Sequence, residues 1–246
     1  KSRAVDFANE ELKRISDIAK DSWYEKPTAL ATIQYSFHVF RRFMRDDDKI
    51  LEMGPAEGTM TAQLLAAGCD VECLEGSPEF AELLRQKFPR LTVHVALFEA
   101  WESAPRYDLI LLGHVLEHVD TPSDILARAK TWLKPGGKIV CSVPNCRSLH
   151  RQAAVIMGLI ETEQDMSEKD IHHGHRRVYS PETLRADFAR AGMNVDYFGG
   201  YWMKPISDGQ IEEQWTPEML DAFMLLGERY PDIAAELVIV ASDKDT

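Results

Sequence analysis

The sequence predicts an α/β fold with a doubly wound, mostly parallel sheet of seven strands. Three observations favour this Rossmann-like fold. From residue 49 onward, short apolar segments alternate with longer helical segments, as strands and crossover helices do. Apolar segments such as "YDLILLG" lack polar alternation, which is typical of strands buried on both faces. Cap residues bound several of the helical segments.

The first 48 residues precede this alternation and carry two helical patterns, around residues 10–21 and 29–44. In the second, Ile33, Phe37, Phe40 and Met44 repeat at spacings of four, three and four. Such spacing makes one face of a helix apolar. We expect residues 1–48 to form a helical lid over a domain made of residues 49–246.

Cap residues and composition divide the domain into its elements. Ser77 and Thr121 are predicted N-caps, each followed by proline, and Gly68 and Gly192 are predicted to end helices. The pattern loosens after Pro144, which predicts a helical insertion after the fifth strand and acceptor-site insertions at about 146–179 and 202–230. The predicted strands are residues 49–53, 71–76, 91–96, 107–113, 134–144 with its opening turn, 193–202 and 235–242, and the domain's helices are 58–68, 77–88, 121–133, 148–160, 180–192 and 215–230.

Composition and charge narrow the classes of function. The net charge of −12 argues against a large nucleic-acid interface, which needs clustered lysine and arginine. No apolar run approaches the roughly 20 residues that span a bilayer, and the basic first residues are not followed by the apolar segment of a signal peptide. The four cysteines (Cys69, Cys73, Cys141, Cys146) form no Cys-x-x-Cys pair, which favours reduced thiols in a cytoplasmic protein.

The segment after the first strand has the composition of a ligand-binding loop. Glu52 lies at the end of the strand, and Gly54, Ala56 and Gly58 precede a helix. Small residues let the backbone approach a ligand, and the start of a helix offers free N–H groups. A dinucleotide fingerprint needs its glycines at positions one, three and six, whereas the small residues here stand at one, three and five. The Glu52 carboxylate would repel a diphosphate but bind an ammonium group, so the loop favours a cofactor with an amino group and no phosphates.

Together with three further motifs, this loop resembles that of the class I S-adenosylmethionine-dependent methyltransferases. The motifs are an acid at the end of the second strand (Glu75), "YDLILLGHVLEHV" and "LKPGGKIVCSVPN". The resemblance covers about residues 49–198 and the final strand, and is greatest to the group that contains the ubiquinone-biosynthesis O-methyltransferases. Ala56 departs from the family pattern, which has a glycine there. Its methyl group is tolerable at negative φ, and we expect its backbone rather than its side chain to face the ligand.

The resemblance implies S-adenosylmethionine as the cofactor and a role for each matching residue. Glu52 and the loop backbone would hold the aminocarboxypropyl group, and Glu75 would accept both ribose hydroxyls. Three residues after the third strand would line the adenine, and Gly113 and His114 would face the methyl group. The implied cofactor residues are Glu52, Gly54, Ala56, Gly58, Glu75, Gly76, Ser77, Leu97, Phe98, Glu99, Gly113 and His114.

Histidines are the candidates for proton transfer, because methyl transfer to a hydroxyl needs a base near the methyl group. The resemblance implies His173, which stands where quinol-type O-methyltransferases carry a histidine, and His114 is the second candidate. His118, in the "LEHV" motif, is interpreted as structural. His172, His173 and His175 do not match a known zinc pattern, so we expect no metal.

Aromatic, histidine and arginine side chains are candidates for binding the acceptor. A guanidinium group suits a carboxylate or a phosphate, and the aromatic residues stand in the lid or at a strand end. Trp23, in the lid, is a further aromatic candidate. The candidate acceptor residues are Tyr24, Tyr35, His172, His175, Arg176, Arg177, Tyr201 and Trp202.

These features predict a cytoplasmic methyltransferase that acts on an oxygen, hydroxyl or carboxylate, of a small-molecule acceptor. N- or C-methylation of a small molecule and methylation of a protein are the alternatives, as is a cofactor-binding protein without turnover. Neither a nucleic-acid partner nor a membrane span is expected, and the sequence predicts no oligomeric state.

Overall fold

The computed structural model describes residues 2–22, 24 and 26–246, so the candidate Trp23 lies outside the described residues. The helices are α1 (Ser2–Lys20), α2 (Pro27–Phe40), α3 (Thr59–Ala66), α4 (Pro78–Lys87), α5 (Pro122–Thr131), α6 (Leu149–Ile156), α7 (Glu168–His172), α8 (Pro181–Arg190), α9 (Asp208–Gln214) and α10 (Pro217–Arg229), with 3-10 turns at Arg41–Phe43 and Pro231–Ile233. The strands are β1 (Lys49–Met53), β2 (Asp70–Glu75), β3 (Thr92–Val95), β4 (Tyr107–Gly113), β5 (Leu133–Pro144), β6 (Met193–Tyr201) and β7 (Glu236–Asp243).

The strands form one seven-stranded sheet in the order β3-β2-β1-β4-β5-β7-β6. Strands β1 to β5 pair in parallel, whereas β7 is antiparallel to both of its neighbours. The predicted mostly parallel, doubly wound sheet is therefore confirmed. The strand order reverses between β1 and β4, and ligands of such sheets bind beyond the carboxyl ends of the strands at this point.

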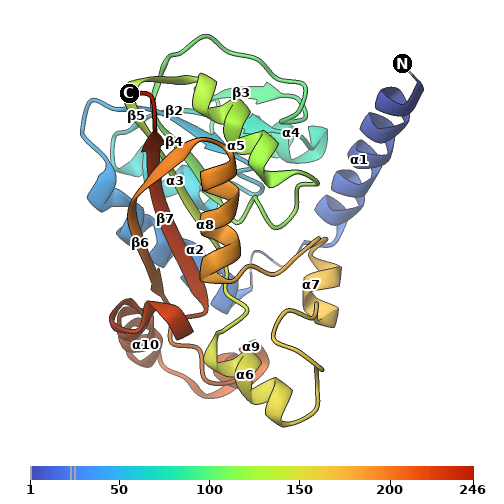
Figure 1. Ribbon diagram of the computed structural model, residues 1–246, viewed down its shortest axis with the longest axis vertical. Helices are drawn as coiled ribbons and strands as arrows, with labels where there is room; N and C mark the ends of the chain where they lie inside the picture. Colours follow the sequence, from blue (N-terminus) through green and yellow to red (C-terminus); the bar gives the residue numbers. More distant parts are fainter. Residues whose placement is uncertain (1, 23, 25) are drawn as a thin grey trace.

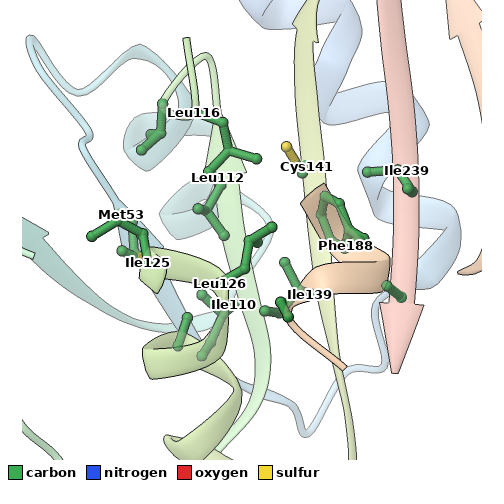
Figure 2. Packing of buried hydrophobic residues seen from close by; sticks show 14 of the residues in the cluster. Met53, Ile110, Leu112, Leu116, Ile125, Leu126, Ile139, Cys141, Phe188 and Ile239 are labelled. Atoms are coloured by element: carbon green, nitrogen blue, oxygen red, sulfur yellow. The ribbon is translucent and has the colours of Figure 1, made fainter. Parts of the chain in front are cut away.

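Helices cover both faces of the sheet (Figure 1). Successive side chains of β4 point to opposite faces: Ile110 packs in the cluster under α5 and α8, and Leu111 in the cluster under α2 and α3. Figure 2 shows the first cluster, with Leu126 of α5 and Phe188 of α8 against Ile139 of β5. Burial on both faces explains why the strand sequences are apolar throughout.

The helix caps lie at the predicted residues. The Ser77 hydroxyl accepts a hydrogen bond from the Phe80 N–H at 3.1 Å, as predicted. Thr121 is the N-cap residue of α5, as predicted, but its side chain makes no capping hydrogen bond. The backbone carbonyl of Thr121 instead accepts from the Asp124 N–H at 3.1 Å, so the donor that a capping side chain would bind is already satisfied.

The additions to the sheet differ in detail from the sequence prediction. Helix α1 begins at Ser2, earlier than predicted, and α6 ends at Ile156 shortly before Gly158, whose φ is +73°. Helices α6 and α7 follow β5, and α9 and α10 follow β6. Figure 1 shows α6, α7 and α9 beyond the end of the sheet where β5 finishes. Within the described residues, no helix combines the length and apolarity of a membrane span.

Candidate active site

Three adjoining cavities lie at the carboxyl ends of the parallel strands. Two of them, of about 110 and 80 Å³, are lined by the loop after β1, and we call them the loop cavities. The third, of about 150 Å³, is lined by residues of α2, the segments after β5 and β6, and the start of β7, and we call it the insertion cavity. Tyr24 and His114 line all three, so the cavities meet at these two side chains.

Glu75, at the end of β2, is a buried carboxylate beside the larger loop cavity. Its oxygens accept hydrogen bonds from the backbone N–H of Ser77 at 2.8 Å and of Ala56 at 3.1 Å. Burial raises the pKa of Glu75 to about 7, although these hydrogen bonds oppose the increase. A carboxylate has about four acceptor positions, so Glu75 keeps acceptor capacity beyond these hydrogen bonds.

The loop after β1 brings its backbone close to both loop cavities. Gly54 has a φ of +63°, and a Cβ atom there would lie 3.1 Å from Val115. Ala56 has a φ of +49°, so it does not meet the condition of a negative φ under which its methyl group was judged tolerable. The left-handed conformation directs the Ala56 N–H to Glu75, at a cost of about 1 kcal/mol for a residue with a Cβ atom.

Glu52 lies at the smaller loop cavity and is almost fully buried. The Thr61 hydroxyl of α3 donates to its Oε2 at 2.6 Å, and the Cys73 Sγ lies 3.7 Å from the same oxygen. Burial raises the pKa of Glu52 to about 7. Neither partner is positively charged, so a ligand with an ammonium group would complement this carboxylate.

Two of the predicted cofactor residues act through their neighbours. Gly58 is the N-cap residue of α3 with a φ of +84°, and a Cβ atom there would lie 2.8 Å from Leu84, so glycine permits the close approach of α3 and α4. Ser77 orients Glu75 and caps α4. Neither residue lines the loop cavities.

Residues of α1 form a wall of the larger loop cavity that the sequence did not identify. A Cβ atom on Gly76 would lie 3.3 Å from Ile15 Cδ1. The Arg14 guanidinium donates to the carbonyls of Gly174 and His118, both at 2.9 Å, which attaches α1 to the domain. The other predicted residues at this cavity are Gly76, Leu97, Phe98 and Glu99, and Gly113 lies at the smaller one.

His114 stands in a strained conformation between two carboxylates. Its φ is +56°, its Nε2 lies 2.9 Å from Glu236, and its Nδ1 lies 3.8 Å from Glu117. Burial alone would lower the pKa of His114, but the two carboxylates outweigh it and raise the pKa to about 9. An imidazolium cannot accept a proton, and this charge disfavours His114 as a base at neutral pH.

The structure separates the three histidines of the "HHGH" segment. His173 is buried beside the insertion cavity, with its ring 5.4 Å from that of Tyr24. Burial, with the charge of Lys169, lowers the pKa of His173 to about 4, so its imidazole is neutral at pH 7. His175 also lines the insertion cavity. His172 lines none of the three cavities, and its Nε2 lies 3.1 Å from the Asp21 carbonyl.

Arg176 and Arg177 do not reach the three cavities. The Arg176 guanidinium donates to the His118 carbonyl at 3.0 Å and to Glu11 of α1 at 2.7 Å. The Arg177 guanidinium donates to the Leu116 carbonyl at 2.8 Å. The two arginines therefore hold the segment after β4 and α1, which is a different role from the predicted binding of an acceptor.

The predicted aromatic residues divide into two groups. Tyr24 and Trp202 line the insertion cavity, and Trp202 turns the chain after β6 with a φ of +73°. The Tyr35 hydroxyl donates to Glu228 at 2.5 Å, and the buried Tyr201 hydroxyl donates to the Thr32 carbonyl at 3.3 Å. Neither Tyr35 nor Tyr201 lines any of the three cavities.

Several residues of the insertion cavity were missed by sequence reasoning. His118, interpreted as structural, lines both this cavity and the larger loop cavity. One potential metal-ligand atom each of His118, Glu117 and His175 lies within 4.8 Å of the others. The sequence had indicated a histidine cluster at 172–175 instead. The other missed residues follow no motif or spacing and come from distant segments: His150, Arg151, Lys169, Asp170, Lys204, Asp208 and Glu236.

The loop cavities fit the cofactor that the sequence implies. S-adenosylmethionine carries a ribose diol, an ammonium group and no phosphate. Glu75 offers free acceptor positions for the diol, Glu52 lacks a positive partner, and the space at Gly54 would be lost with any larger side chain. The buried carboxylates would disfavour a diphosphate.

Sequence comparison identifies a family. The model of the methyltransferase domain matches residues 25–197. The ubiquinone biosynthesis O-methyltransferase of Xanthomonas axonopodis pv. citri is 24% identical over 217 residues, which cover 83% of this chain and 88% of that protein. The enzyme of the same name from Burkholderia multivorans is 27% identical, covering 74% of this chain and 81% of that protein.

Solved structures share the fold at low identity. A methyltransferase of Thermotoga maritima, described as a possible histamine N-methyltransferase, has a TM-score of 0.62 at 17% identity and covers 90% of this chain and 94% of its own. The 1,6-didemethyltoxoflavin-N1-methyltransferase of Burkholderia thailandensis was solved with S-adenosylhomocysteine. It has a TM-score of 0.60 at 16% identity, and the match covers 99% of this chain and 90% of that chain. The chain belongs to the methyltransferase-domain family and is a class I S-adenosylmethionine-dependent methyltransferase.

Proposed function

We propose that the protein methylates an oxygen of a small-molecule acceptor that binds in the insertion cavity. The observation that carries this proposal is the meeting of the three cavities at Tyr24 and His114, with the neutral imidazole of His173 on the insertion side. A hydroxyl or carboxylate placed there would lie beside the cofactor's methyl group and a base. The ubiquinone biosynthesis enzymes named above are O-methyltransferases, which supports the choice of oxygen.

The chain's own residues act mainly by positioning. The cofactor supplies a methyl group on a sulfonium. Glu75 and Glu52 hold the two ends of the cofactor, and Tyr24 and His114 shape the junction between the cavities. A ring nitrogen of His173 takes the acceptor's proton, and the positive charge of His114 favours the oxyanion that results.

N-methylation of a small molecule is the main rival function, because two of the structural neighbours are described as N-methyltransferases. A neutral amine needs no base during the displacement, so loss of His173 would then matter little. Methylation of a protein and cofactor binding without turnover are two further rival functions. The cytoplasmic location stays a prediction, supported by four free cysteines.

The test uses acceptors that differ only in one atom, such as matched phenols and anilines. We expect the methyl group on oxygen, located by mass spectrometry, and a loss of about 100-fold in kcat for His173→Ala. His172→Ala, a neighbour outside the cavities, is the matched control and keeps its activity. Transfer to nitrogen alone, or a loss of less than about threefold in His173→Ala, contradicts the proposal.

The pH dependence of kcat provides a second measurement. His173 must be deprotonated, so the rate rises as pH increases through about 4. His114 must be protonated, so the rate falls as pH increases through about 9. Without His173, the acidic limb of this profile disappears.

A further inference from the structure

The charged lining of the insertion cavity contains more cations than carboxylates. Among the described lining residues, the cations are His114, Arg151, Lys169 and Lys204, and the carboxylates are Asp170, Asp208 and Glu236. Two of these cations already face carboxylates: His114 lies 2.9 Å from Glu236 and 3.8 Å from Glu117, which does not line the cavity, and Arg151 donates to Asp170 at 3.0 Å. The excess of positive charge therefore lies in the remaining group.

That group consists of two lysines around one carboxylate. Lys204 is buried, and its Nζ lies 2.6 Å from Asp208 Oδ1. The Lys169 ammonium binds the other oxygen of Asp208. Two ammonium groups on one carboxylate leave one positive charge uncompensated. Burial lowers the pKa of Lys204 and the charge of Lys169 lowers it further, while Asp208 opposes both, so a second anion would stabilise the group.

The backbone fixes Lys204 at this position. Trp202 turns the chain after β6 with a positive φ, and the Lys204 N–H donates to the Trp202 carbonyl at 3.0 Å. The Lys204 carbonyl accepts from the His150 N–H at 3.2 Å, which connects this turn to α6. The ammonium group is thus carried by a constrained turn that joins the two insertions.

His150 adds a neutral donor to the same part of the cavity. Its Nδ1 is buried and makes no hydrogen bond with any described residue. Burial, with the charge of Lys204, lowers the pKa of His150 to about 3, so its imidazole is neutral and can donate one hydrogen bond. Arg151 has fewer donors left for a ligand, because its guanidinium already donates to Asp170 and to the Glu163 carbonyl.

We propose that Lys204, Lys169 and His150 bind an anionic group of the acceptor, a carboxylate or a phosphate. This inference rests on the proposed function, because it names the class of acceptor for the same cavity. The acceptor then carries an anionic group in addition to its reacting oxygen. Its anionic end lies against the two insertions, and its reacting oxygen lies toward His173 and Tyr24.

The test measures anion binding by calorimetry to the full chain saturated with S-adenosylhomocysteine, at constant ionic strength. The probes are inorganic phosphate, benzoate and the neutral analogue benzamide. We expect saturable binding of phosphate or benzoate, whichever matches the natural group, and none of benzamide. Lys204→Met should weaken binding of that anion at least tenfold, and Lys169→Met, at a more exposed site, severalfold.

Two further variants separate anion binding from a general structural effect. Asp208→Asn removes the competing carboxylate, so the anion should bind more tightly. Lys134→Met breaks a lysine–aspartate pair outside the cavity, with Asp108 at 2.7 Å, and should change nothing. Equal binding in the wild type and both lysine variants overturns the inference, as does weaker binding in Asp208→Asn. Failure of S-adenosylhomocysteine to bind would instead overturn the proposed function.

Discussion

The charged side chains of the loop cavities and of the insertion cavity are positioned by contacts that differ in sequence separation. Glu75 is oriented by Ser77, two residues later, and Glu52 by Thr61, nine residues later. In the insertion cavity, His114 pairs with Glu236, which belongs to the last strand. Neighbours along the chain therefore orient Glu75 and Glu52, whereas His114 and Glu236 meet only in the complete sheet.

The two regions also differ in the sign of their unbalanced charge. The loop cavities hold two buried carboxylates whose pKa burial raises to about 7. The insertion cavity holds an excess of ammonium groups around Asp208. Each region is thus complementary to a ligand of opposite charge, and under the proposed function cofactor and acceptor are recognised by separate electrostatic means. Three substitutions in the loop cavities test this contrast.

The largest effect is expected from Glu75→Ala. The carboxylate would make two charge-assisted hydrogen bonds to the ribose diol, each contributing about 1.5–3 kcal/mol. Its loss also leaves the N–H groups of Ser77 and Ala56 without their acceptor. We expect affinity for S-adenosylhomocysteine to fall at least about 100-fold, measured by calorimetry.

Glu82→Ala is the matched control for this substitution. Glu82 lies in α4, where it accepts a hydrogen bond from Gln86 at 3.0 Å and stands outside the three cavities. Its loss should leave cofactor affinity unchanged. If both variants bind S-adenosylhomocysteine as the wild type does, the loop cavities are not the cofactor site.

The sequence predicted the sheet and the loop cavities because both depend on short-range signals. The apolar run in β4 and the serine cap of α4 can be recognised without knowing the fold. Thr121 stands at the predicted N-cap position, but its side chain makes no capping hydrogen bond because its backbone carbonyl binds the same donor, which composition does not reveal.

The insertion cavity was predicted only in part, for a physical reason. Lys204 is oriented by a turn next to α6, and Glu236 faces His114 only once β7 has paired with β5. Their roles arise from contacts between distant segments, so no local pattern indicates them. Arg176 is the opposite case. Its position beside the histidines suggested ligand binding, but its guanidinium holds α1 through Glu11.

An intermediate effect, with a distinct pH dependence, is expected from Glu52→Gln. The folded pKa of about 7 lies above the ordinary value of 4.5, so the stability contributed by protonated Glu52 is complete below pH 4.5 and is lost as pH rises through about 7. The loss corresponds to roughly 3 kcal/mol at most. The cofactor-free variant should therefore unfold at higher temperature than the wild type at pH 8, with little difference at pH 4.5.

The same variant should bind the cofactor less well, because glutamine cannot pair with the ammonium group as a carboxylate does. We expect about tenfold weaker binding of S-adenosylhomocysteine at pH 8. Calorimetry and thermal unfolding at both pH values provide the measurement. If the variant gains no stability at pH 8, or keeps full affinity, Glu52 is not a buried carboxylate that binds the ammonium group of the cofactor.

The smallest effect is expected from Ala56→Gly, which tests how the backbone and side chain of this residue divide their roles. The left-handed φ of +49° costs alanine about 1 kcal/mol, and glycine removes this cost while adding freedom to the unfolded chain. Stability should rise by less than about 1 kcal/mol, and affinity for S-adenosylhomocysteine should stay within about twofold. Ala67→Gly is the control, since Ala67 has a φ of −80° and glycine there only destabilises. A tenfold loss of affinity in Ala56→Gly would mean that the methyl group itself contacts the cofactor, and local backbone geometry alone would then not account for the loop cavities.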